Sequence, residues 1–413
     1  MDRKNQNFDV IIVGGGIVAL TACLILAQEG FKIGVICNQL KGSNNKNTTN
    51  TRSLAVTQTS MRIFDTIGLG KKIKKNSYSF DEIEVFDAHL REISCYPNIT
   101  FNHRQKNSGS LGQIIKSEHM RKIIFNEVTN LKNVSFVQYN NINQVFYNDQ
   151  KIFIRINKYH SLSANICIVA DGKNSALSKA LGVKGIKKDY KQSSLTFDFS
   201  YKNTDCLRSK AYQFFFPGGP LALLPLSKDI FSVVWTLKVH EAKRLHNLSS
   251  KDFLFLFNKK CMNIFRDIKL LSKININPLS HYNANKYVHD RFVLVGDSAH
   301  FIHPIAGQGL NIGLKDVALL AEVIVDHYRL GLDIGNPIHL KKYQTLRRID
   351  NAIVARGSEY LNAIFSKKSN ILSFARGIGF NAINNLALVK NFLTECGKGN
   401  FGYLPRLSRG KKI

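Results

Sequence analysis

Acidic residues are scarce in this chain of 413 residues, in which 29 Asp and Glu stand against 58 Lys and Arg and leave a formal net charge of +29. Three explanations are open: binding to nucleic-acid phosphates, attraction to an anionic membrane surface, and a compositional bias in a chain also rich in Asn and Ile. The lysines are spread evenly and no nucleic-acid-binding motif is present, so we expect no nucleic-acid partner. Bias and membrane attraction are compatible, and both stay open.

Long apolar runs are also absent. No stretch of about 18 uncharged apolar residues exists, so the sequence predicts no membrane-spanning helix. Met1-Asp2-Arg3-Lys4 ahead of a short apolar run is similar to the start of a signal peptide, but glycines and a strand pattern follow at once. We therefore expect a soluble or membrane-peripheral protein.

Redox, metal and hydrolase motifs are missing as well. The cysteines form no C-x-x-C pair and several lie in apolar strand patterns, which indicates reduced core thiols in a cytoplasmic protein. The histidines show no metal-site spacing, although His300 and His303 come nearest, and we expect no metal. No Ser-His-Asp or paired-carboxylate pattern is found. The cysteines are Cys23, Cys37, Cys95, Cys167, Cys206, Cys261 and Cys396.

The most informative segment runs from Val293 to Leu314. It opens with a buried-strand pattern, breaks at Gly296-Asp297, turns at Pro304 and at 307–309, and becomes an apolar helix from about Leu310. A carboxylate at a strand end can hold the hydroxyls of a ribityl chain. The bare helix N-terminus beyond it carries about half a positive charge, which suits the electron-rich edge of a reduced flavin. The alternative is an ordinary strand–loop–helix unit with glycine turns.

A second motif lies at the start of the chain. Residues 10–13 form a strand pattern, Gly14-x-Gly16-x-x-Ala19 follows, and an apolar helix over 17–28 leads to a second strand over 32–37. This is a dinucleotide fingerprint in its proper context, with Gly14 for the tight turn, Gly16 for close approach of a diphosphate and Ala19 for helix packing. Cys37 stands where an acidic residue usually holds the adenosine ribose, which predicts looser discrimination.

A third motif, over residues 165–182, places a short strand ahead of Asp171-Gly172, with Ser175 able to cap the next helix. With these three motifs in order, the chain resembles the class A flavoprotein aromatic hydroxylases, the p-hydroxybenzoate hydroxylase-like group. Within that group it is similar to the ubiquinone-biosynthesis hydroxylases. The residues that carry this finer resemblance are Thr51–Ala55, Gly218–Leu226, Ser232–Trp235 and Ala299–Asn311.

The resemblance implies an α/β fold, with a discontinuous Rossmann-like FAD-binding domain, an inserted antiparallel-sheet substrate domain and a helical C-terminal region. It implies an FAD-dependent monooxygenase that uses O2, through a flavin hydroperoxide, to hydroxylate a prenylated phenol or quinone precursor of ubiquinone. The expected location is cytoplasmic and peripheral at the inner membrane, near other ubiquinone-biosynthesis proteins. Alternatives are a catabolic phenol hydroxylase, a prenyl reductase, or a non-catalytic assembly subunit.

The resemblance also assigns roles to residues. The glycine fingerprint and Arg52 should hold the FAD diphosphate, Gln113 and Asp297 the ribityl chain, and Asp171 and Gly172 the middle of the cleft. The loop before the last helix should lie under the flavin pyrimidine, with Pro304 at the rim of the reacting face. The predicted cofactor-binding residues are Gly14, Gly16, Ala19, Arg52, Gln113, Asp171, Gly172, Asp297, Gly307, Gln308, Gly309, Leu310 and Asn311.

The substrate wall is predicted on the apolar strand over residues 220–225, which suits a phenol with an isoprenoid tail. The alternative is plain sheet core. Pro304 is expected to border the reacting ring. Tyr212 or His303 could serve as a base toward the phenol, but nothing in the sequence selects one. The predicted wall residues are Pro220, Leu221, Leu223 and Pro225.

One departure from the family pattern concerns the electron donor. Such enzymes often read Asp-Gly-x-x-Ser-x-x-Arg, and here Ser178 occupies the arginine position, with Lys179 beside it. If that arginine helps to dock a reductant, nicotinamide use is in doubt. Electrons are therefore expected from NAD(P)H or from a ferredoxin-type protein.

The expected domain organisation is discontinuous. The FAD-binding domain comprises 1–80, 109–183 and 283–335, and the substrate-binding sheet comprises 81–108 and 184–282. Residues 336–413 read as a helical region, because apolar residues recur there at helical spacing. That apolar stripe is either core packing or a basic amphipathic surface that touches lipid or a partner.

Overall fold

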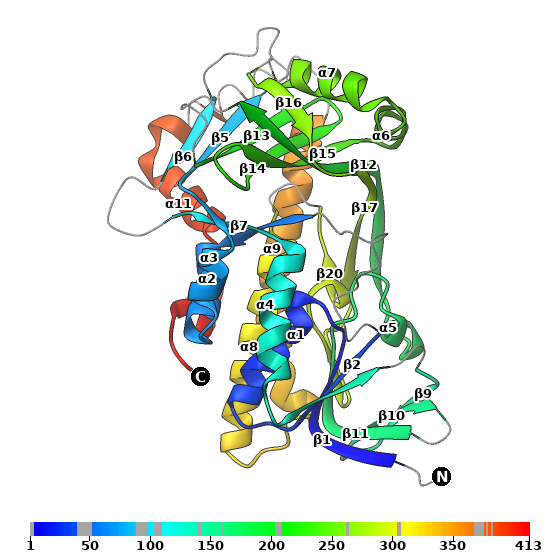
Figure 1. Cartoon of the computed structure of the whole chain (residues 1–413). Coiled ribbons are helices and arrows are strands. Elements are labelled where there is room, and N and C mark those ends of the chain that lie inside the picture. Colours follow the sequence, from blue (N-terminus) through cyan, green and yellow to red (C-terminus); the bar gives the residue numbers. More distant parts are fainter. Residues whose placement is uncertain are drawn as a thin grey trace.

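A computed structural model describes residues 4–38, 52–87, 97–102, 110–138, 142–157, 160–202, 209–261, 264–303, 307–366, 376, 379–380 and 383–413. At one end of the molecule lies a mainly parallel sheet in the order β18-β19-β11-β1-β2-β8, which β10 and β9 extend as antiparallel strands (Figure 1). Its strands are β1 (Lys4–Val13), β2 (Ile33–Cys37), β8 (Val134–Gln138), β9 (Gln144–Tyr147), β10 (Ile152–Asn157), β11 (His160–Val169), β18 (Val288–His289) and β19 (Phe292–Leu294).

Helices cover this parallel sheet. The first helix, α1, is apolar on all sides because it is enclosed by the sheet and by its neighbours α4 and α8, so almost every residue in it is buried. The helices of this region are α1 (Ile17–Gln28), α2 (Gln58–Thr66), α3 (Gly70–Lys75), α4 (Ser117–Thr129), α5 (Ala176–Ala180) and α8 (Gly309–Arg329).

At the other end lies a larger, mostly antiparallel sheet in the order β20-β17-β12-β15-β14-β13-β5-β6, with β16 paired to β12. Helices α6 (Val239–His246) and α7 (Ser250–Lys260) cover its outer face (Figure 1). Its strands are β5 (Glu82–Asp87), β6 (Ile99–Asn102), β12 (Gly185–Lys202), β13 (Lys210–Phe216), β14 (Gly219–Pro225), β15 (Ile230–Lys238), β16 (Arg266–Leu270), β17 (Asn275–Ala284) and β20 (His300–Phe301). The sequence pattern also predicts a strand over residues 92–96, which lie outside the described part of the chain.

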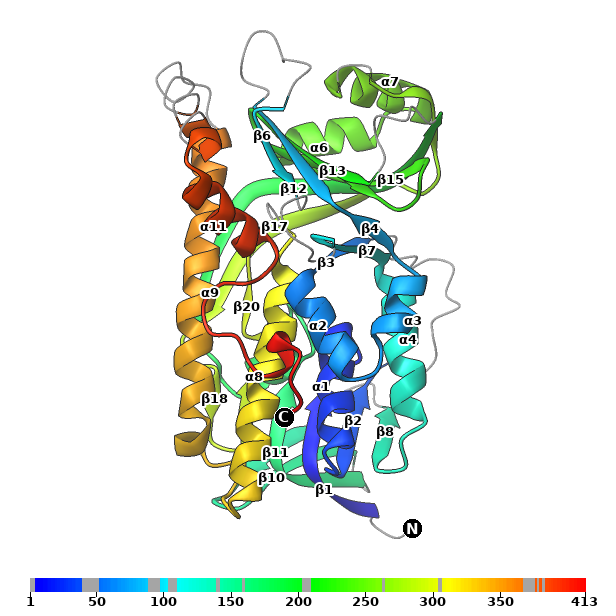
Figure 2. The same ribbon diagram turned by 90° about the vertical axis from the view of Figure 1, so that its left-hand side faces the viewer.

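A small sheet of β3 (Ser53–Thr57), β7 (Gly112–Lys116) and β4 (Tyr78–Phe80) lies between the two large ones (Figure 2). The long helix α9 (Pro337–Ser366) runs along the molecule from one large sheet to the other, and α11 (Ala387–Gly397) crosses its far end (Figure 2). The C-terminal tail, which includes the short helix η4 (Leu407–Arg409), returns to the cofactor end, where the Thr59 hydroxyl donates to the Lys398 carbonyl oxygen at 2.8 Å.

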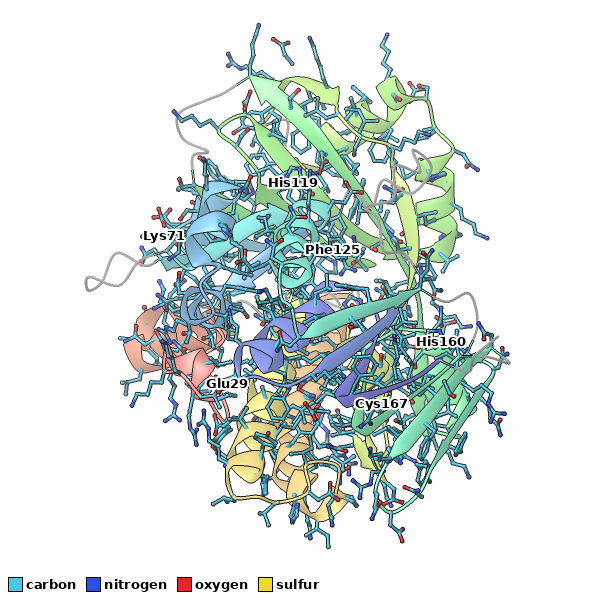
Figure 3. The ribbon with its side chains drawn as sticks, turned by 60° about the horizontal axis from the view of Figure 1, so that its bottom comes forward. Glu29, Lys71, His119, Phe125, His160 and Cys167 are labelled. Carbon is cyan, nitrogen blue, oxygen red and sulfur yellow. The ribbon has the colours of Figure 1, made fainter. Side chains whose placement is uncertain are left out.

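The five described cysteines form no disulfide, and four of them are buried, such as Cys167 within the parallel sheet (Figure 3). Cys95 and Cys206 lie outside the described residues. Lysines such as Lys71 project at the edge of the molecule (Figure 3). In the part of the chain that the structure describes, no helix has the length and apolar character needed to span a bilayer, and no three His, Cys, Asp or Glu side chains gather as metal ligands would.

Candidate functional site

The glycine loop after β1 meets the requirements of a diphosphate cradle. Gly14 has a φ of +133°, and a Cβ there would lie 2.2 Å from the Ala170 carbonyl oxygen, so glycine is needed where β1 and β11 run side by side. Gly16 is the N-cap of α1, and a Cβ on it would meet no atom within 4 Å. No side chain caps the first turn of α1, so its N–H groups remain available to an anion. Ala19 is fully buried where the helix packs.

The side chain of Arg121 lies beside the glycine loop, and Cys37 occupies the position at the end of β2 where a carboxylate is usual. Cys37 ends β2 with a buried side chain, whose Cβ lies 3.1 Å from where a Cβ on Gly15 would be. Arg121 of α4 donates from Nε to the Gly15 carbonyl oxygen at 2.8 Å. Arg121 could not be found from the sequence, because it lies 106 residues from Gly15 and in no motif.

Ser298 joins the Gly-Asp segment over residues 293–314 to the third motif, Asp171-Gly172. Its hydroxyl donates to Asp171 Oδ1 at 3.1 Å and accepts from the Gly172 backbone N–H at 3.0 Å. Gly172 has a φ of +89°, which favours glycine. Since β11 and β19 are neighbouring parallel strands and each motif follows one of them, the two motifs meet at the same edge of the sheet, next to the glycine loop.

Asp297 is open to solvent and yet surrounded by protein. Its side chain is exposed, while burial by the surrounding protein raises its pKa, an effect that His300, Arg52 and Lys173 oppose. We therefore expect a ligand that binds at this strand end to cover the Asp297 carboxylate. Arg52 thus stands around this carboxylate, and so does Lys173, which the sequence motifs did not single out.

The start of α8 is a second helix N-terminus without a side-chain cap. Gln308 is its N-cap residue and Gly309 its first residue, while Leu310 packs against the core of the parallel sheet. Gly307 has a φ of +60°, and a Cβ on it would approach the Ala55 side chain at 3.8 Å. This brings Gly307, just before α8, against Ala55 of β3. Pro304 lies outside the described residues, so its predicted place at the reacting face stays a prediction.

Asn311 fastens β3 to α8. Its amide donates to the Ala55 carbonyl oxygen at 2.9 Å and accepts from the Thr57 backbone N–H at 3.0 Å. Both ends of the amide are thus used within the protein. Asn311 therefore positions the two segments, and its predicted direct contact with a cofactor stays a prediction.

Arg52 and Gln113 enter from the small middle sheet. Arg52 precedes β3 with an exposed side chain, and its carbonyl oxygen accepts from the Ser117 N–H at 3.0 Å. Gln113 is buried in β7, where its amide accepts from the Ser77 hydroxyl at 2.8 Å and donates to the Ser110 hydroxyl at 3.3 Å. Their predicted contacts with FAD are not tested by these bonds.

The predicted substrate wall on β14 falls mostly on the wrong face of the strand. Leu221 and Leu223 are fully buried in the core beneath α6 and α7, and Tyr212 of β13 lies in the same core. Because side chains alternate along a strand, Pro225 shares that outer face, and only Pro220 of the predicted wall turns the other way. Leu221, Leu223 and Tyr212 therefore point away from the cofactor domain, which contradicts their predicted contact with substrate.

The inner face of the sheet lies over the cofactor segments. In register, Ala222 pairs with Gln213 on one side and with Val234 on the other, and all three are half-buried. Leu224, two residues further along β14, packs in one apolar cluster with Ala55 of β3. Since Ala55 also adjoins Gly307, this face is the one that looks toward the loop before α8.

His303 lies beneath this inner face. It is 1% exposed, and its Nε2 lies 3.2 Å from Oε1 of Gln192 on β12. Burial lowers the pKa of His303 to about 4, so the ring is neutral at neutral pH. Of the two predicted candidates for a base, the structure therefore leaves His303 on the cofactor side and Tyr212 on the far side.

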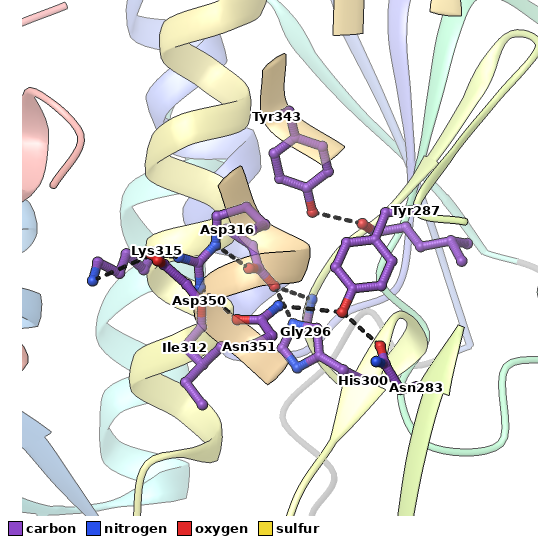
Figure 4. Close-up of polar contacts among 12 residues, drawn as sticks. Asn283, Tyr287, Gly296, His300, Ile312, Lys315, Asp316, Tyr343, Asp350 and Asn351 are labelled. Carbon is purple, nitrogen blue, oxygen red and sulfur yellow. Dashed lines mark hydrogen bonds and ion pairs between the residues drawn. The ribbon is translucent and has the colours of Figure 1, made fainter. Parts of the chain in front are cut away.

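A buried ionic network supports the Gly-Asp turn from behind (Figure 4). The Asp316 carboxylate of α8 accepts from the Gly296 N–H at 3.0 Å and from Arg347 Nε at 2.7 Å, and lies 2.6 Å from His300 Nε2. Burial alone would raise the pKa of Asp316, but His300 and Arg347 outweigh burial and hold it at about 2. The ring of His300, which the sequence offered as half of a metal pair, is thus engaged by a carboxylate.

Arg347 of α9 is the centre of this network. Its side chain is fully buried, and it donates to Asp350 Oδ2 and to Asn351 Oδ1, each at 2.7 Å. Lys315 Nζ lies 3.8 Å from Asp350 Oδ2, and burial lowers the pKa of Lys315 to about 8. The sequence analysis missed this network, because its charges occur in ordinary helix patterns without a motif.

Ser178, the residue in the family's arginine position, is turned inward. The Ser175 and Ser178 hydroxyls lie 2.6 Å apart, and the Ser178 N–H donates to Ser175 Oγ at 2.9 Å, which caps α5 as predicted for Ser175. Ser178 is buried while Lys179 is exposed. A reductant therefore has no side chain of Ser178 to contact.

Sequence comparison places the chain among FAD proteins. A family model described as FAD binding domain matches residues 7–349. The ubiquinone hydroxylase UbiL of Rhodospirillum rubrum is 28% identical over 97% of this chain and 92% of that protein. The ubiquinone biosynthesis monooxygenase COQ6 of Dictyostelium discoideum is 25% identical over 96% of this chain and 92% of its own. The 3-demethoxyubiquinol 3-hydroxylase of Escherichia coli is 26% identical over 94% of this chain and 97% of its own.

Solved structures share the fold. The p-nitrophenol 4-monooxygenase PnpA of Pseudomonas putida superposes with a TM-score of 0.79 at 17% identity, covering 96% of this chain and 99% of that one. PqsL of Pseudomonas aeruginosa, described as a probable FAD-dependent monooxygenase, gives 0.74 at 19% identity, covering 91% and 99%. The predicted fold class, a Rossmann-like sheet with an antiparallel sheet and C-terminal helices, is thereby confirmed.

Proposed function

The chain belongs to the FAD-binding monooxygenase family, and on that basis we propose that it hydroxylates the aromatic ring of a prenylated phenol or quinone precursor in ubiquinone biosynthesis. FAD-dependent monooxygenation is the activity of the family. The ubiquinone precursor is supported by relatives named for ubiquinone hydroxylation that align over nearly the whole chain. The observation that carries the proposal is the meeting of three cofactor motifs beneath the inner face of the antiparallel sheet.

Bound FAD supplies the activation of dioxygen, and the protein supplies position and electrostatics. The N-terminus of α1 at Gly16 holds the diphosphate, with the exposed cation Arg52 placed to pair with it. Asp297 accepts hydrogen bonds from the ribityl hydroxyls. The N-terminus of α8 at Gly309 stabilises negative charge at the edge of the reduced ring.

The substrate lies between the inner face of the sheet and the loop before α8. Ala222, Leu224 and Val234 give this space an apolar ceiling that suits an aromatic ring with an isoprenoid tail. Gln213, the fourth half-buried residue, adds an amide to that ceiling, and its Nε2 has no hydrogen-bond partner within the described chain. The proposed substrate wall thus contains Ala222 and Leu224 of β14 in place of the predicted Leu221 and Leu223.

A donor-independent turnover tests the reaction. Purified holoenzyme is reduced with dithionite and then mixed with oxygenated buffer that contains a short-chain prenylated phenol, and the products are separated and weighed by mass spectrometry. We expect a product heavier by one oxygen atom, labelled when 18O2 is used. Recovery of the unchanged phenol with hydrogen peroxide alone, or of a phenol whose prenyl double bond is reduced, would overturn the proposal.

Asp297→Ala should weaken FAD binding by about 10- to 150-fold, because a charged acceptor for hydroxyl groups contributes roughly 1.5–3 kcal/mol. The fold should persist, since the side chain is exposed. Flavin retention is measured by absorbance after gel filtration and affinity by fluorescence titration of the apoprotein. Asp290→Ala, which removes an exposed carboxylate seven residues earlier in the chain, is the matched control and should bind FAD as the wild type does. Equal affinity in both variants would contradict the role of Asp297.

We also propose that the enzyme docks on an anionic membrane through a stripe on α9 and α11. The exposed apolar residues of α9 recur along a helix about 45 Å long, and its exposed charged side chains are all basic. On α11 no described residue is buried, and Leu388 and Phe392 are 86% and 66% exposed. The apolar members of the stripe are Ile338, Ile349, Ile353, Tyr360, Leu361, Ile364, Leu386, Leu388, Val389 and Phe392; the basic members are Lys341, Lys342, Arg348 and Arg356.

The positive charge of this stripe favours an anionic membrane over a second copy of the chain as its binding partner. Two copies of the chain that met through it would bring basic side chains against each other, whereas anionic lipid headgroups complement them. The acidic residues of α9 do not offset this charge, because Asp350 is buried with Arg347 and Glu359 accepts from Lys188. A prenylated substrate dissolves in the same bilayer, so docking would bring the enzyme to it.

Binding to vesicles tests the stripe. The wild type should sediment with phosphatidylserine-containing vesicles but poorly with neutral ones, and binding should fall steeply with salt as the Debye length shrinks to roughly 8 Å at physiological ionic strength. Lys341→Gln with Arg348→Gln should weaken binding about 30-fold, at about 1 kcal/mol per charge.

The matched control for charge is Lys71→Gln with Lys75→Gln on α3, which lies on the opposite side of the molecule from α9 (Figure 2). This pair removes the same charge and should change binding little. If the two pairs weaken binding equally, or if the wild type binds neither kind of vesicle at low salt, the stripe is not a membrane surface.

A further inference from the structure

The hydrogen bonds around Gln192 fix the orientation of its side-chain amide. Its Nε2 lies 2.7 Å from the Gly218 carbonyl oxygen, which can only accept, so the NH2 group must face Gly218. Oε1 therefore faces the other way, toward His303 Nε2 at 3.2 Å and the Asn362 side-chain NH2 at 3.2 Å. Gln192 and Asn362 thus form a pair of amides that joins β12 to α9 beside the histidine.

This orientation decides the tautomer of His303. Because Oε1 of Gln192 is an acceptor, the His303 Nε2 must carry the proton and donate it. Burial lowers the pKa of His303 to about 4, so a second proton is absent at neutral pH. Nδ1 is left with its lone pair, and within the described chain it has no hydrogen-bond partner although it is buried.

Neighbouring groups do not account for this acceptor. The ring of Tyr190 packs edge-on against His303 at 4.9 Å between centroids, but the Tyr190 hydroxyl is directed to Glu359 Oε1 at 3.3 Å. A buried acceptor without a donor costs about 1–3 kcal/mol, so such an atom in a native structure calls for a ligand or a solvent molecule. If His303 only packed in the core, its buried Nδ1 would be left without a hydrogen-bond donor.

The location of His303 matches the space assigned to the substrate. Gln192 and Thr196 lie on the same face of β12, and Thr196 pairs with Val234 of the inner face. His303, bonded to Gln192, therefore lies under that face, and the chain continues from it to Gly307, which adjoins Ala55. His303 thus lies against β12 on the inner face of the sheet, and the Leu224–Ala55 cluster lies against β14 on the same face.

We propose that His303 Nδ1 accepts a hydrogen bond from the ring hydroxyl of the phenolic substrate, and that Gln192 and Asn362 are positioning residues that hold His303 in the Nε2–H tautomer. This inference rests on the proposed function. A phenol that donates to a neutral imidazole keeps its proton but gains electron density on its ring, which favours transfer of an electrophilic oxygen atom. The acceptor also orients the ring, since it recognises one hydroxyl.

The tautomer can be measured without substrate or turnover. In 15N-labelled holoenzyme at pH 7, long-range 1H–15N correlation spectra distinguish a protonated from an unprotonated ring nitrogen, and His303→Asn identifies the signals. We expect protonated Nε2 and unprotonated Nδ1 for His303, and a mixture of tautomers in Gln192→Leu. An Nδ1–H tautomer or an imidazolium in the wild type would overturn the proposal whatever the enzyme's substrate.

A pair of ligands separates hydrogen bonding from packing. A short-chain prenylated phenol and its methyl ether are titrated into oxidised holoenzyme, with binding followed by the change in flavin absorbance. His303→Leu should weaken binding of the phenol about tenfold, the size of one hydrogen bond left unmade, and leave the ether unchanged. His303→Asn, whose Oδ1 can take the place of Nδ1, should recover part of the loss.

The controls keep this inference distinct from the proposed function. His289→Leu on β18, far from the inner face, should affect neither ligand. If His303→Leu weakens phenol and ether equally, the residue only packs, and the proposal is overturned while hydroxylation stands. If the wild type hydroxylates no prenylated phenol yet shows the expected tautomer and phenol–ether difference, the function fails and the hydrogen bond stands.

Discussion

Asp316→Ala is expected to lower the free energy of unfolding by about 3–5 kcal/mol, which is the usual loss when one partner of a buried ion pair is removed. Arg347 would remain fully buried without its main counter-ion, and the Gly296 N–H would lose its acceptor. Urea denaturation followed by far-ultraviolet circular dichroism measures the loss.

Asp326→Ala is the matched control for this variant. Asp326 lies on the same helix and also pairs with an arginine, Arg406, but this pair is about one-third exposed. Exposed pairs contribute about 1 kcal/mol or less. Equal destabilisation by the two substitutions would show that burial of the Asp316 network has no special weight.

The same network predicts how stability depends on pH. The folded pKa of Asp316 is about 2, below the ordinary value of 3.8, so its contribution is complete above pH 4 and is lost as pH falls toward 2. The wild type should therefore lose part of its stability advantage over Asp316→Ala across this acid window. A gap between the two proteins that stays constant from pH 5 to 2 would contradict the assignment.

Gly14→Ala should be the most damaging change in the cofactor motifs. The new Cβ would lie 2.2 Å from the Ala170 carbonyl oxygen, at a φ of +133°. Backbone strain of roughly 1–3 kcal/mol and overpacking of roughly 1–3 kcal/mol add to an expected loss of about 2–6 kcal/mol. The measurement is the midpoint of urea unfolding of the apoprotein.

Gly16→Ala separates folding from cofactor binding. The backbone of Gly16 has an ordinary φ of −80°, and its Cβ would meet no protein atom. The apoprotein should then unfold within about 1 kcal/mol of the wild type, while the methyl group obstructs the diphosphate and FAD is lost on gel filtration. Retention of FAD by Gly16→Ala would place the diphosphate elsewhere.

The contiguous motifs could be predicted from the sequence because each carries its own local signal. The helix predicted over 17–28 is α1, and the strand predicted over 32–37 is β2 but for its first residue. The strand ahead of Asp171 begins earlier than predicted, because antiparallel pairing with β10 extends β11 to His160. Joining of the motifs by Ser298 follows from parallel strands ending at one edge.

Other features depend on contacts between distant segments and leave no local signal. The residues over 220–225 are apolar on both faces, so alternation alone does not tell which face meets α6 and α7, and Leu221 and Leu223 were assigned to the wrong one. Arg347 resembles any helix arginine until α8 brings Asp316 to it. The meeting of Arg121 with the glycine loop depends in the same way on how α4 packs against α1.

The return of the C-terminal tail has a consequence for how the protein is made. Thr59 and Lys398 are bonded across 339 residues of sequence, and α8, the second proposed cofactor helix, begins only at Gly309. A ribosome that adds 5–20 residues per second takes roughly 20–80 s to reach the tail. Until then the proposed FAD site consists of the glycine loop between β1 and α1 without the segments that complete it. We therefore expect flavin to bind only after α8 and the segment around Lys398 have been synthesised, so that its supply acts on a late folding step.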